Sequence, residues 1–241
     1  MKKLRHFFAI TLVAFLGFTS CDAAKLLFGE PSETEVIYAL QKLLDSSALR
    51  AIATISDLNN NGVESLLPEE LQPVLGVLKT TGAIDNIDEI EAKIGDVAQD
   101  VTVETGEILK DAVKELSFGD AVAVVLGGED AATQVLKNAM YTTAKKRYSS
   151  KIENELIQVE PNIMDYWAAG STAYNLFADD KVDSSLADFL AERSVDVLFG
   201  EIGNKEADIR NNYQDLGDIV VTKVFDFYKN NPNGTQQGGW N

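Results

Sequence analysis

The chain has 241 residues, of which 45% are hydrophobic, and carries a formal net charge of −17. Such an acidic surface repels phosphate backbones, which argues against a nucleic acid partner. The only histidine is His6 and the only cysteine is Cys21. Because His6 lies in an expected leader, the remaining chain excludes a Ser-His-Asp triad, a Cys-His pair and a histidine-bearing zinc site. One cysteine also excludes an intramolecular disulfide.

Residues 1–20 have the plan of a secretory signal peptide that ends before Cys21. The segment opens with three basic residues, Lys2, Lys3 and Arg5. The apolar run at 7–18 that follows is too short to span a bilayer comfortably. Residues 18–20 (Phe-Thr-Ser) resemble a relaxed bacterial lipobox, which implies cleavage before Cys21 and a lipid on its thiol. We therefore expect an exported lipoprotein, on the outer membrane if the host has two membranes.

Residues 21–31 are expected to form a tether, and a helix follows it. Ser32 and Glu35 form a capping box, in which Ser32 caps the helix and Glu35 reaches back to it. Apolar residues then recur at helical spacing and predict one broad buried face. This face consists of Val36, Ile37, Leu40, Leu43, Leu44, Ala48, Ala51, Ile52 and Ile55. Residues 57–62, rich in Asn and ending in Gly, are expected to end the helix.

The rest of the chain reads as further helices joined by turns. We expect helices at 67–82 and 85–116, then a short helix after Ser117 that stops at Gly127 and Gly128. Later helices are expected at about 129–158, 163–177 and 216–229, with one beginning at Asp183 or Ser184 and running through Ile209. No run of alternating strands is present. The sequence therefore predicts an all-α bundle of seven to eight helices without a sheet, forming a single domain over 32–229 with a flexible tail at 230–241.

Five short segments carry a resemblance to a known family. They are residues 67–71 (Leu-Pro-Glu-Glu-Leu), 116–121 (Leu-Ser-Phe-Gly-Asp-Ala), 126–133 (Leu-Gly-Gly-Glu-Asp-Ala-Ala-Thr), 190–199 and 206–210. On these segments the chain resembles domain-of-unknown-function family 4197, over most of residues 33–228. The resemblance implies an all-helical exported domain, and it supplies no reaction and no catalytic residues. The chain departs from the family's pattern at 59–62, where the family has a longer loop, and at 214–218.

One loop has part of the pattern of a calcium site. Asp57, Asn59 and Asn61 occupy positions one, three and five of an EF-hand-like loop, and Gly62 occupies position six. Position twelve, which requires a bidentate glutamate, is Pro68. The same residues are typical of a turn that stops a helix, and the missing ligand favours that interpretation.

The glycine pair at 127–128 precedes a predicted helix start, where backbone amides can hold an anion. Glu129 and Asp130 already occupy the positive end of that helix and would repel a phosphate. A corner between two helices is therefore the favoured interpretation, and an anion site is the alternative.

Candidate binding residues are few. Arg50, Arg193 and Arg210 fall in stretches that resemble the family. Structural ion pairs are the favoured interpretation of these arginines, and a pocket for a carboxylate is the alternative. Trp167 shares a helix face with Tyr174, seven residues later, which favours core packing over a pocket wall.

Taken together, these features predict a lipid-anchored envelope protein whose role is non-enzymatic binding of a protein or a small ligand. Two alternatives stay open: a carboxylate-based hydrolase acting on envelope glycans, and a carrier of a small apolar ligand. The sequence predicts no cofactor. Its expected partners are the membrane, through the acyl anchor on Cys21, and an envelope protein or small ligand.

Overall fold

The structure, a computed structural model, describes residues 29–58, residues 121–232 and seven isolated helical positions between them (89, 92, 93, 96, 97, 112 and 113). These residues form six α-helices and one 3-10 helix, and none of them lies in a strand. The predicted all-α class is thus confirmed for this part of the chain. The helices expected at 67–82 and 85–116 lie outside the described residues, apart from those isolated positions. The total of seven to eight therefore stays a prediction.

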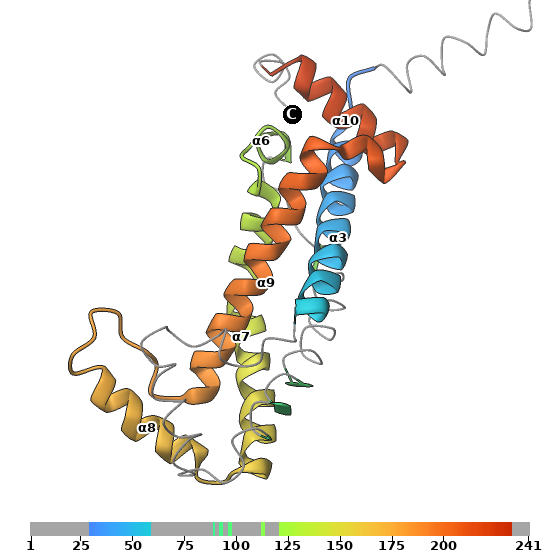
Figure 1. The fold of residues 1–241 in the computed structure, drawn as a ribbon. Coiled ribbons are helices and arrows are strands. Elements are labelled where there is room, and N and C mark those ends of the chain that lie inside the picture. Colours follow the sequence, from blue (N-terminus) through green and yellow to red (C-terminus); the bar gives the residue numbers. More distant parts are fainter. Residues whose placement is uncertain are drawn as a thin grey trace, which may run out of the picture.

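Two long antiparallel helices form the axis of the molecule. α7 (Ala131–Val159) and α9 (Leu186–Asn211) pack along each other, and at 1.5 Å per residue each is about 40 Å long. Three polar pairs join them, with numbers rising on α7 and falling on α9: Lys137–Asp196, Lys145–Glu192 and Ser149–Asp188. Figure 1 shows the two helices side by side.

α3 (Glu33–Leu58) packs along α9 and completes a three-helix body. Its predicted capping box is confirmed: the Glu35 N–H donates to Ser32 Oγ at 3.3 Å, and the Ser32 N–H donates to Glu35 Oε2 at 2.8 Å. Its predicted apolar face is also confirmed, because Leu40, Leu43 and Leu44 are fully buried there. The helix starts where the sequence places its cap, so the chain enters the body at this end of α3.

The chain closes with η3 (Tyr213–Leu216) and α10 (Ile219–Asn230), which lie against the start of α3. The prediction of a helix starting at residue 216 was wrong by three residues. Gly217 has a φ of 64°, a left-handed conformation that ends η3. The Asp218 side chain then caps α10 by accepting from the N–H groups of Val220 and Val221.

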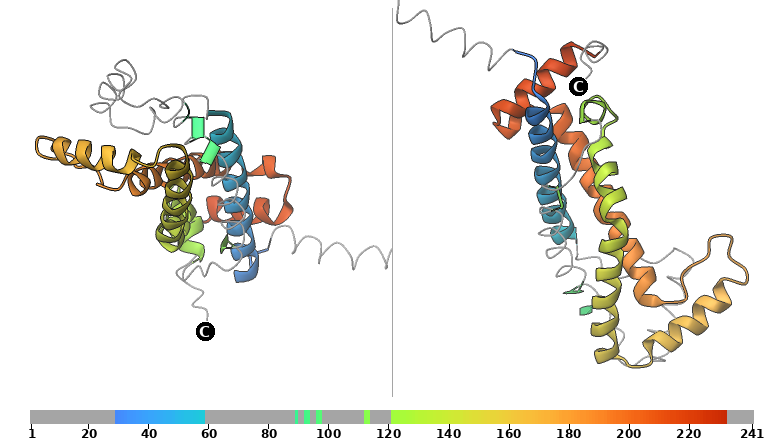
Figure 2. Two further views of the ribbon diagram at one scale, coloured as in Figure 1. Left: turned by 90° about the horizontal axis from the view of Figure 1, so that it is seen from below. Right: turned by 180° about the vertical axis from the view of Figure 1, so that it is seen from behind.

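Two shorter helices lie at opposite ends of this body. α6 (Ala121–Val125) lies near α10, whereas α8 (Ile163–Tyr174) leaves the far end of α7 and extends sideways (Figures 1 and 2). The helix predicted over 163–177 ends at Tyr174 because the chain turns there. α9 is capped by Ser185, whose Oγ accepts from the Asp188 N–H, rather than by Asp183 or Ser184.

The core follows the α7–α9 axis and reaches into α3 and α10. Its largest fully buried side chains come from three helices: Leu40, Leu43, Leu44, Leu136, Tyr148, Ile152, Leu156, Leu190, Leu198, Phe199 and Ile202. Within the described residues, no helix is both long enough and apolar enough to cross a membrane.

Candidate functional site

A buried carboxylate, Glu206 of α9, holds the start of α7. Its side chain is fully buried. Glu206 Oε1 accepts from the Ala132 N–H at 3.0 Å, and Glu206 Oε2 accepts from both the Thr133 N–H and the Thr133 hydroxyl at 2.6 Å. These amides belong to the first turn of α7, where a negative charge is favourable. The helix start after the glycine pair therefore does hold an anion, and that anion is a side chain of the protein itself.

Arg210, one turn later on α9, completes this arrangement. Its Nε donates to Glu206 Oε1 at 2.7 Å, while its two terminal nitrogens donate to the carbonyls of Val125 and Val124 at 2.8 and 3.0 Å. Those carbonyls lie at the C-terminal end of α6, where a cation is favourable. We call Glu206, Arg210 and these partners the Glu206–Arg210 network. It ties α9 to both sides of the α6–α7 corner.

Two glycines allow this corner to pack closely. A Cβ on Gly203 of α9 would lie 3.3 Å from the Cβ of Asp130, so the absence of a side chain brings α9 against the start of α7. A Cβ on Gly127 would lie 2.7 Å from the Cβ of Ala131, which is closer than two non-bonded carbon atoms can approach. The corner interpretation of residues 127–128 is thus the one that the geometry supports.

The predicted ligand residues lie in different places. Arg210 is only 10% exposed and belongs to the Glu206–Arg210 network, so it is a structural residue. Arg193 precedes it by 17 residues on the same helix, which separates the two by about 25 Å. Arg50 is exposed on α3. The three arginines therefore do not form one pocket.

Trp167 also serves packing. Its Nε1 donates to the Asp183 carbonyl at 2.9 Å, and its ring lies 5.0 Å from that of Phe189, centroid to centroid. This contact holds α8 to the start of α9. The sequence interpretation of Trp167 as a core residue agrees with this position, and the ring does not line either of the hollows described below.

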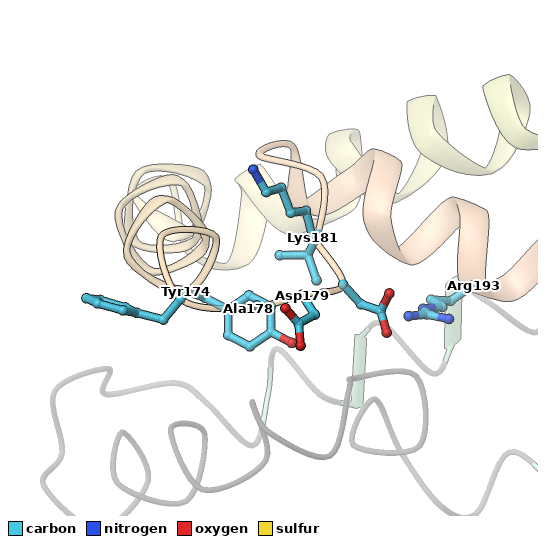
Figure 3. A pocket seen from close by; sticks show the side chains of 8 residues that line it. Tyr174, Ala178, Asp179, Lys181 and Arg193 are labelled. Atoms are coloured by element: carbon cyan, nitrogen blue, oxygen red, sulfur yellow. The ribbon is translucent and has the colours of Figure 1, made fainter.

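Arg193 lines an open hollow of about 640 Å³ beside the segment that joins α8 to α9. We call it the α8–α9 hollow. Its other walls are Tyr174, Phe177, Ala178, Asp179, Asp180, Lys181 and Val182. The Arg193 guanidinium also lies 5.5 Å from the centre of the Phe189 ring. Figure 3 shows the side chains that line the hollow, among them Tyr174, Asp179, Lys181 and Arg193. The hollow therefore offers charges of both signs and aromatic surface.

The loop above this hollow, residues 175–182, exposes two large apolar side chains that the sequence analysis missed. Leu176 is 74% exposed and Phe177 is 91% exposed. The sequence analysis placed both at the end of the helix predicted over 163–177. The signal available was the turn-like composition of residues 175–181 (Asn-Leu-Phe-Ala-Asp-Asp-Lys).

A second open hollow of about 740 Å³ lies between α7 and α9, and includes Glu129, Asp130, Asp196 and Gly203 in its walls. Two of its three carboxylates have partners: Asp130 Oδ2 accepts from Gln134 Nε2 at 2.7 Å, and Asp196 pairs with Lys137 at 3.2 Å. Tyr141 lies on α7 one turn after Lys137. Burial and the nearby Asp196 carboxylate raise its pKa to about 12. Tyr141 therefore stays protonated at neutral pH, and does not act as a base there.

A metal site finds no support in the described part of the chain, where no three His, Cys, Asp or Glu residues cluster. The calcium candidate (Asp57, Asn59 and Asn61) lies outside the residues whose side chains are described. Cys21, the predicted lipidation site, lies outside them as well.

The described residues thus form an all-α body that is held by the internal Glu206–Arg210 network and has open hollows on its surface. Comparison with known protein families matches residues 30–226 to the family described as "Protein of unknown function (DUF4197)". The chain belongs to that family, as the sequence resemblance predicted. No curated protein and no solved structure matches the chain. Two segments that carried the resemblance, 126–133 and 206–210, meet in the Glu206–Arg210 network.

Proposed function

We propose that the protein is a lipid-anchored envelope protein that works as a non-enzymatic interaction module. The anchor rests on the leader at 1–20 and on the lipobox-like residues before Cys21. The export compartment and the outer membrane location rest on the same residues. The charge of −17 favours a basic protein partner over a nucleic acid.

One observation carries the non-enzymatic assignment. Glu206 and Arg210, two of the three charged residues of a segment that resembles the family, bond to backbone groups and to each other and are almost inaccessible to solvent. A catalytic carboxylate has to reach a substrate, and Glu206 is enclosed by four donors. Glu206 and Arg210 therefore stabilise the body of the protein. We assign binding to its surface instead.

The two alternative functions receive less support. A glycan hydrolase requires two carboxyl groups facing one substrate, whereas Asp130 and Asp196 in the α7–α9 hollow are engaged by Gln134 and Lys137. A carrier of an apolar ligand requires an enclosed apolar cavity, and both described hollows are open and lined by charged residues.

The anchor is tested with Cys21→Ala in the full chain. We expect the wild-type protein to incorporate an alkyne-labelled fatty acid and to fractionate with membranes. The variant should lose the label and appear in the soluble envelope fraction, because the thiol is the acyl acceptor. A variant that still fractionates with membranes would show that the anchor assignment is wrong.

The interaction role is tested by native mass spectrometry of the gently purified protein, combined with chemical crosslinking in cells of the native host. A protein adduct without a bound small molecule supports the interaction module. A bound lipid or apolar molecule recovered at one per chain would instead favour the carrier, and turnover of envelope glycan fragments would favour the hydrolase.

A further inference from the structure

We propose that the loop at 175–182 is the docking element of this module, and that its partner is an envelope protein with an apolar pocket bordered by basic residues. This inference rests on the proposed function for the compartment, and on the structure for the surface. Phe177 is the central contact, Leu176 is its neighbour, and Asp179 and Asp180 supply the charge.

The loop is held in shape before any partner binds. The Asn175 side chain bridges its two ends: Nδ2 donates to the Val182 carbonyl at 2.8 Å, and Oδ1 accepts from the Val182 N–H at 2.9 Å. The N–H groups of Phe177 and Ala178 each donate to the Tyr174 carbonyl at 3.0 Å. Val182 itself is buried, at 7% exposed. A loop fixed in this way loses little conformational entropy when it is bound.

Its apolar side chains do not serve the fold. Phe177 is the most exposed of the large apolar side chains in the described residues, at 91%, and Leu176 follows it at 74%. Packing of Phe177 against the core therefore contributes little to stability. An exposed aromatic side chain on a rigid support is the kind of group that dominates binding energy in protein interfaces. The burial pattern thus favours a binding role for this pair.

The loop lies at the end of the molecule that is opposite the tether. The chain enters α3 beside α10, while α8 and the loop extend from the far end of the α7–α9 pair (Figures 1 and 2). α7 alone spans 29 residues, or about 43 Å. With an acyl anchor at Cys21, this arrangement lets the loop face away from the anchoring membrane, toward other envelope proteins.

The charge of the chain distinguishes three kinds of partner for this surface: an anionic lipid membrane, a second copy of the chain, and another protein. Asp179 and Asp180 are exposed next to Phe177, and the whole chain carries −17. Anionic lipid headgroups and a second copy of the chain would both be repelled. A basic rim on a protein partner would be attracted by the net negative charge of the chain. At the α8–α9 hollow its side chains would meet Asp179 and Asp180, beside Lys181 and Arg193, which line the same hollow.

The test uses the full chain in cells of its native host, with the photocrosslinking amino acid benzoylphenylalanine at position 177. The control places the same residue at Leu49, which is 54% exposed on α3. We expect a discrete protein adduct from position 177 that position 49 does not give. The captured protein is identified by mass spectrometry, purified, and used as the probe in calorimetry with wild-type and variant chains.

Calorimetry then examines the chemistry of the contact. Phe177→Ser should weaken binding by about 30-fold or more, as expected for a central aromatic contact. The double variant Asp179→Lys, Asp180→Lys should also weaken it, whereas the matched change Glu30→Lys, Glu33→Lys at the tether end should not. Raising NaCl from about 50 mM to about 300 mM should weaken wild-type binding, because the attraction is screened.

Three results would overturn the assigned partner or its contact. They are an adduct of twice the mass of the chain, which indicates a second copy; an adduct with lipid alone; and binding that survives both Phe177→Ser and the charge reversal. Circular dichroism melts of these variants exclude unfolding as the cause of a loss, since Phe177 is almost fully exposed. A protein adduct from position 49 alone would show that docking through the 175–182 loop is wrong, while still supporting an interaction role for the protein. No protein adduct from any surface position would overturn both.

Discussion

Glu206 shows how one side chain can determine a corner of this fold. Its carboxylate accepts four hydrogen bonds, from two amides, one hydroxyl and one guanidinium. The side chain of Asp130, the N-cap residue of α7, accepts no hydrogen bond from the backbone N–H groups of that helix. The cap that would normally be local is instead supplied by α9, from 73 residues away along the chain. Removing it therefore affects both helix termini at once.

Glu206→Ala should strongly destabilise the protein, by about 3–5 kcal/mol, because it leaves the Arg210 charge buried without its carboxylate partner and the α7 amides without an acceptor. Glu206→Gln, which keeps an acceptor but not the charge, should cost about 1–3 kcal/mol. Urea unfolding measures both. The matched control is Glu192→Gln on the same helix, whose side chain is 50% exposed and pairs with Lys145 of α7; it should cost less than about 1 kcal/mol. Equal effects of Glu206→Ala and Glu192→Gln would contradict the structural role.

At the scale of elements, the ends of the helices depend on specific turn residues. Gly217 adopts a left-handed conformation between η3 and α10, and Asp218 then caps α10. The Tyr38 hydroxyl of α3 also donates to Asp218 Oδ2 at 2.8 Å. Burial acts against ionisation of Asp218, but these hydrogen bonds prevail and lower its pKa below the ordinary value of 3.8. One aspartate thus starts α10 and fixes it to α3.

Two glycine substitutions should have opposite signs. Gly217→Ala places a Cβ at a φ of 64° and should destabilise the protein, by about 1 kcal/mol or more. Gly200→Ala lies in the interior of α9, where the added Cβ meets open space, and should stabilise the protein by about 0.5–1 kcal/mol. Thermal melts of the two variants check the signs. A stabilising Gly217→Ala would show that the left-handed turn is misassigned.

An ion pair between α3 and α10 fastens one end of the molecule. Lys223 donates to Glu35 Oε1 and Oε2 at 2.8 and 3.0 Å. The hydrogen bond from Lys223, followed by the one from the Ser32 N–H, lowers the pKa of Glu35 below its ordinary value of 4.5. A carboxyl group with a lowered pKa stabilises the folded state fully above the ordinary value, and that contribution is lost as the pH falls through the lowered one.

Glu35→Gln tests this contribution, because glutamine keeps the capping box and removes the ion pair. We expect the variant to be less stable than wild type at pH 7 by about 1 kcal/mol. The difference should shrink below pH 4.5, the ordinary pKa of Glu35, as the wild-type carboxyl becomes protonated. Urea unfolding across the acid range measures the difference, with Glu33→Gln, an exposed residue of the same helical turn, as the control. A difference that stays constant with pH would rule out the ion pair as its source.

Helix identity and the buried face of α3 could be predicted from the sequence because both depend on local chemistry. Ser32 and Glu35 bond across three residues, and Leu40, Leu43 and Leu44 share a face through the helical repeat alone. The same local rules placed the corner at Gly127 and Gly128, and they identified Trp167 as a packed residue. They misplaced the starts of α9 and α10 and the end of α8, because several residues near each end can cap or turn a helix.

Only the tertiary structure decided the roles of the charged and apolar residues that meet neighbours far away in the chain. Arg210 was a candidate ligand contact in the sequence, and it became a structural residue once α6 and Glu206 surrounded it. Phe177 was the last residue of a predicted helix, and only the turn after Tyr174 placed it in solvent. The sequence by itself determined the charge and the all-α class of the described residues, and it predicts the leader, since these are sums and patterns along the chain. Some charged and apolar side chains are used in contacts within the protein, and others stay available for a partner. The difference depends on contacts between residues far apart in the chain, which exist only after packing.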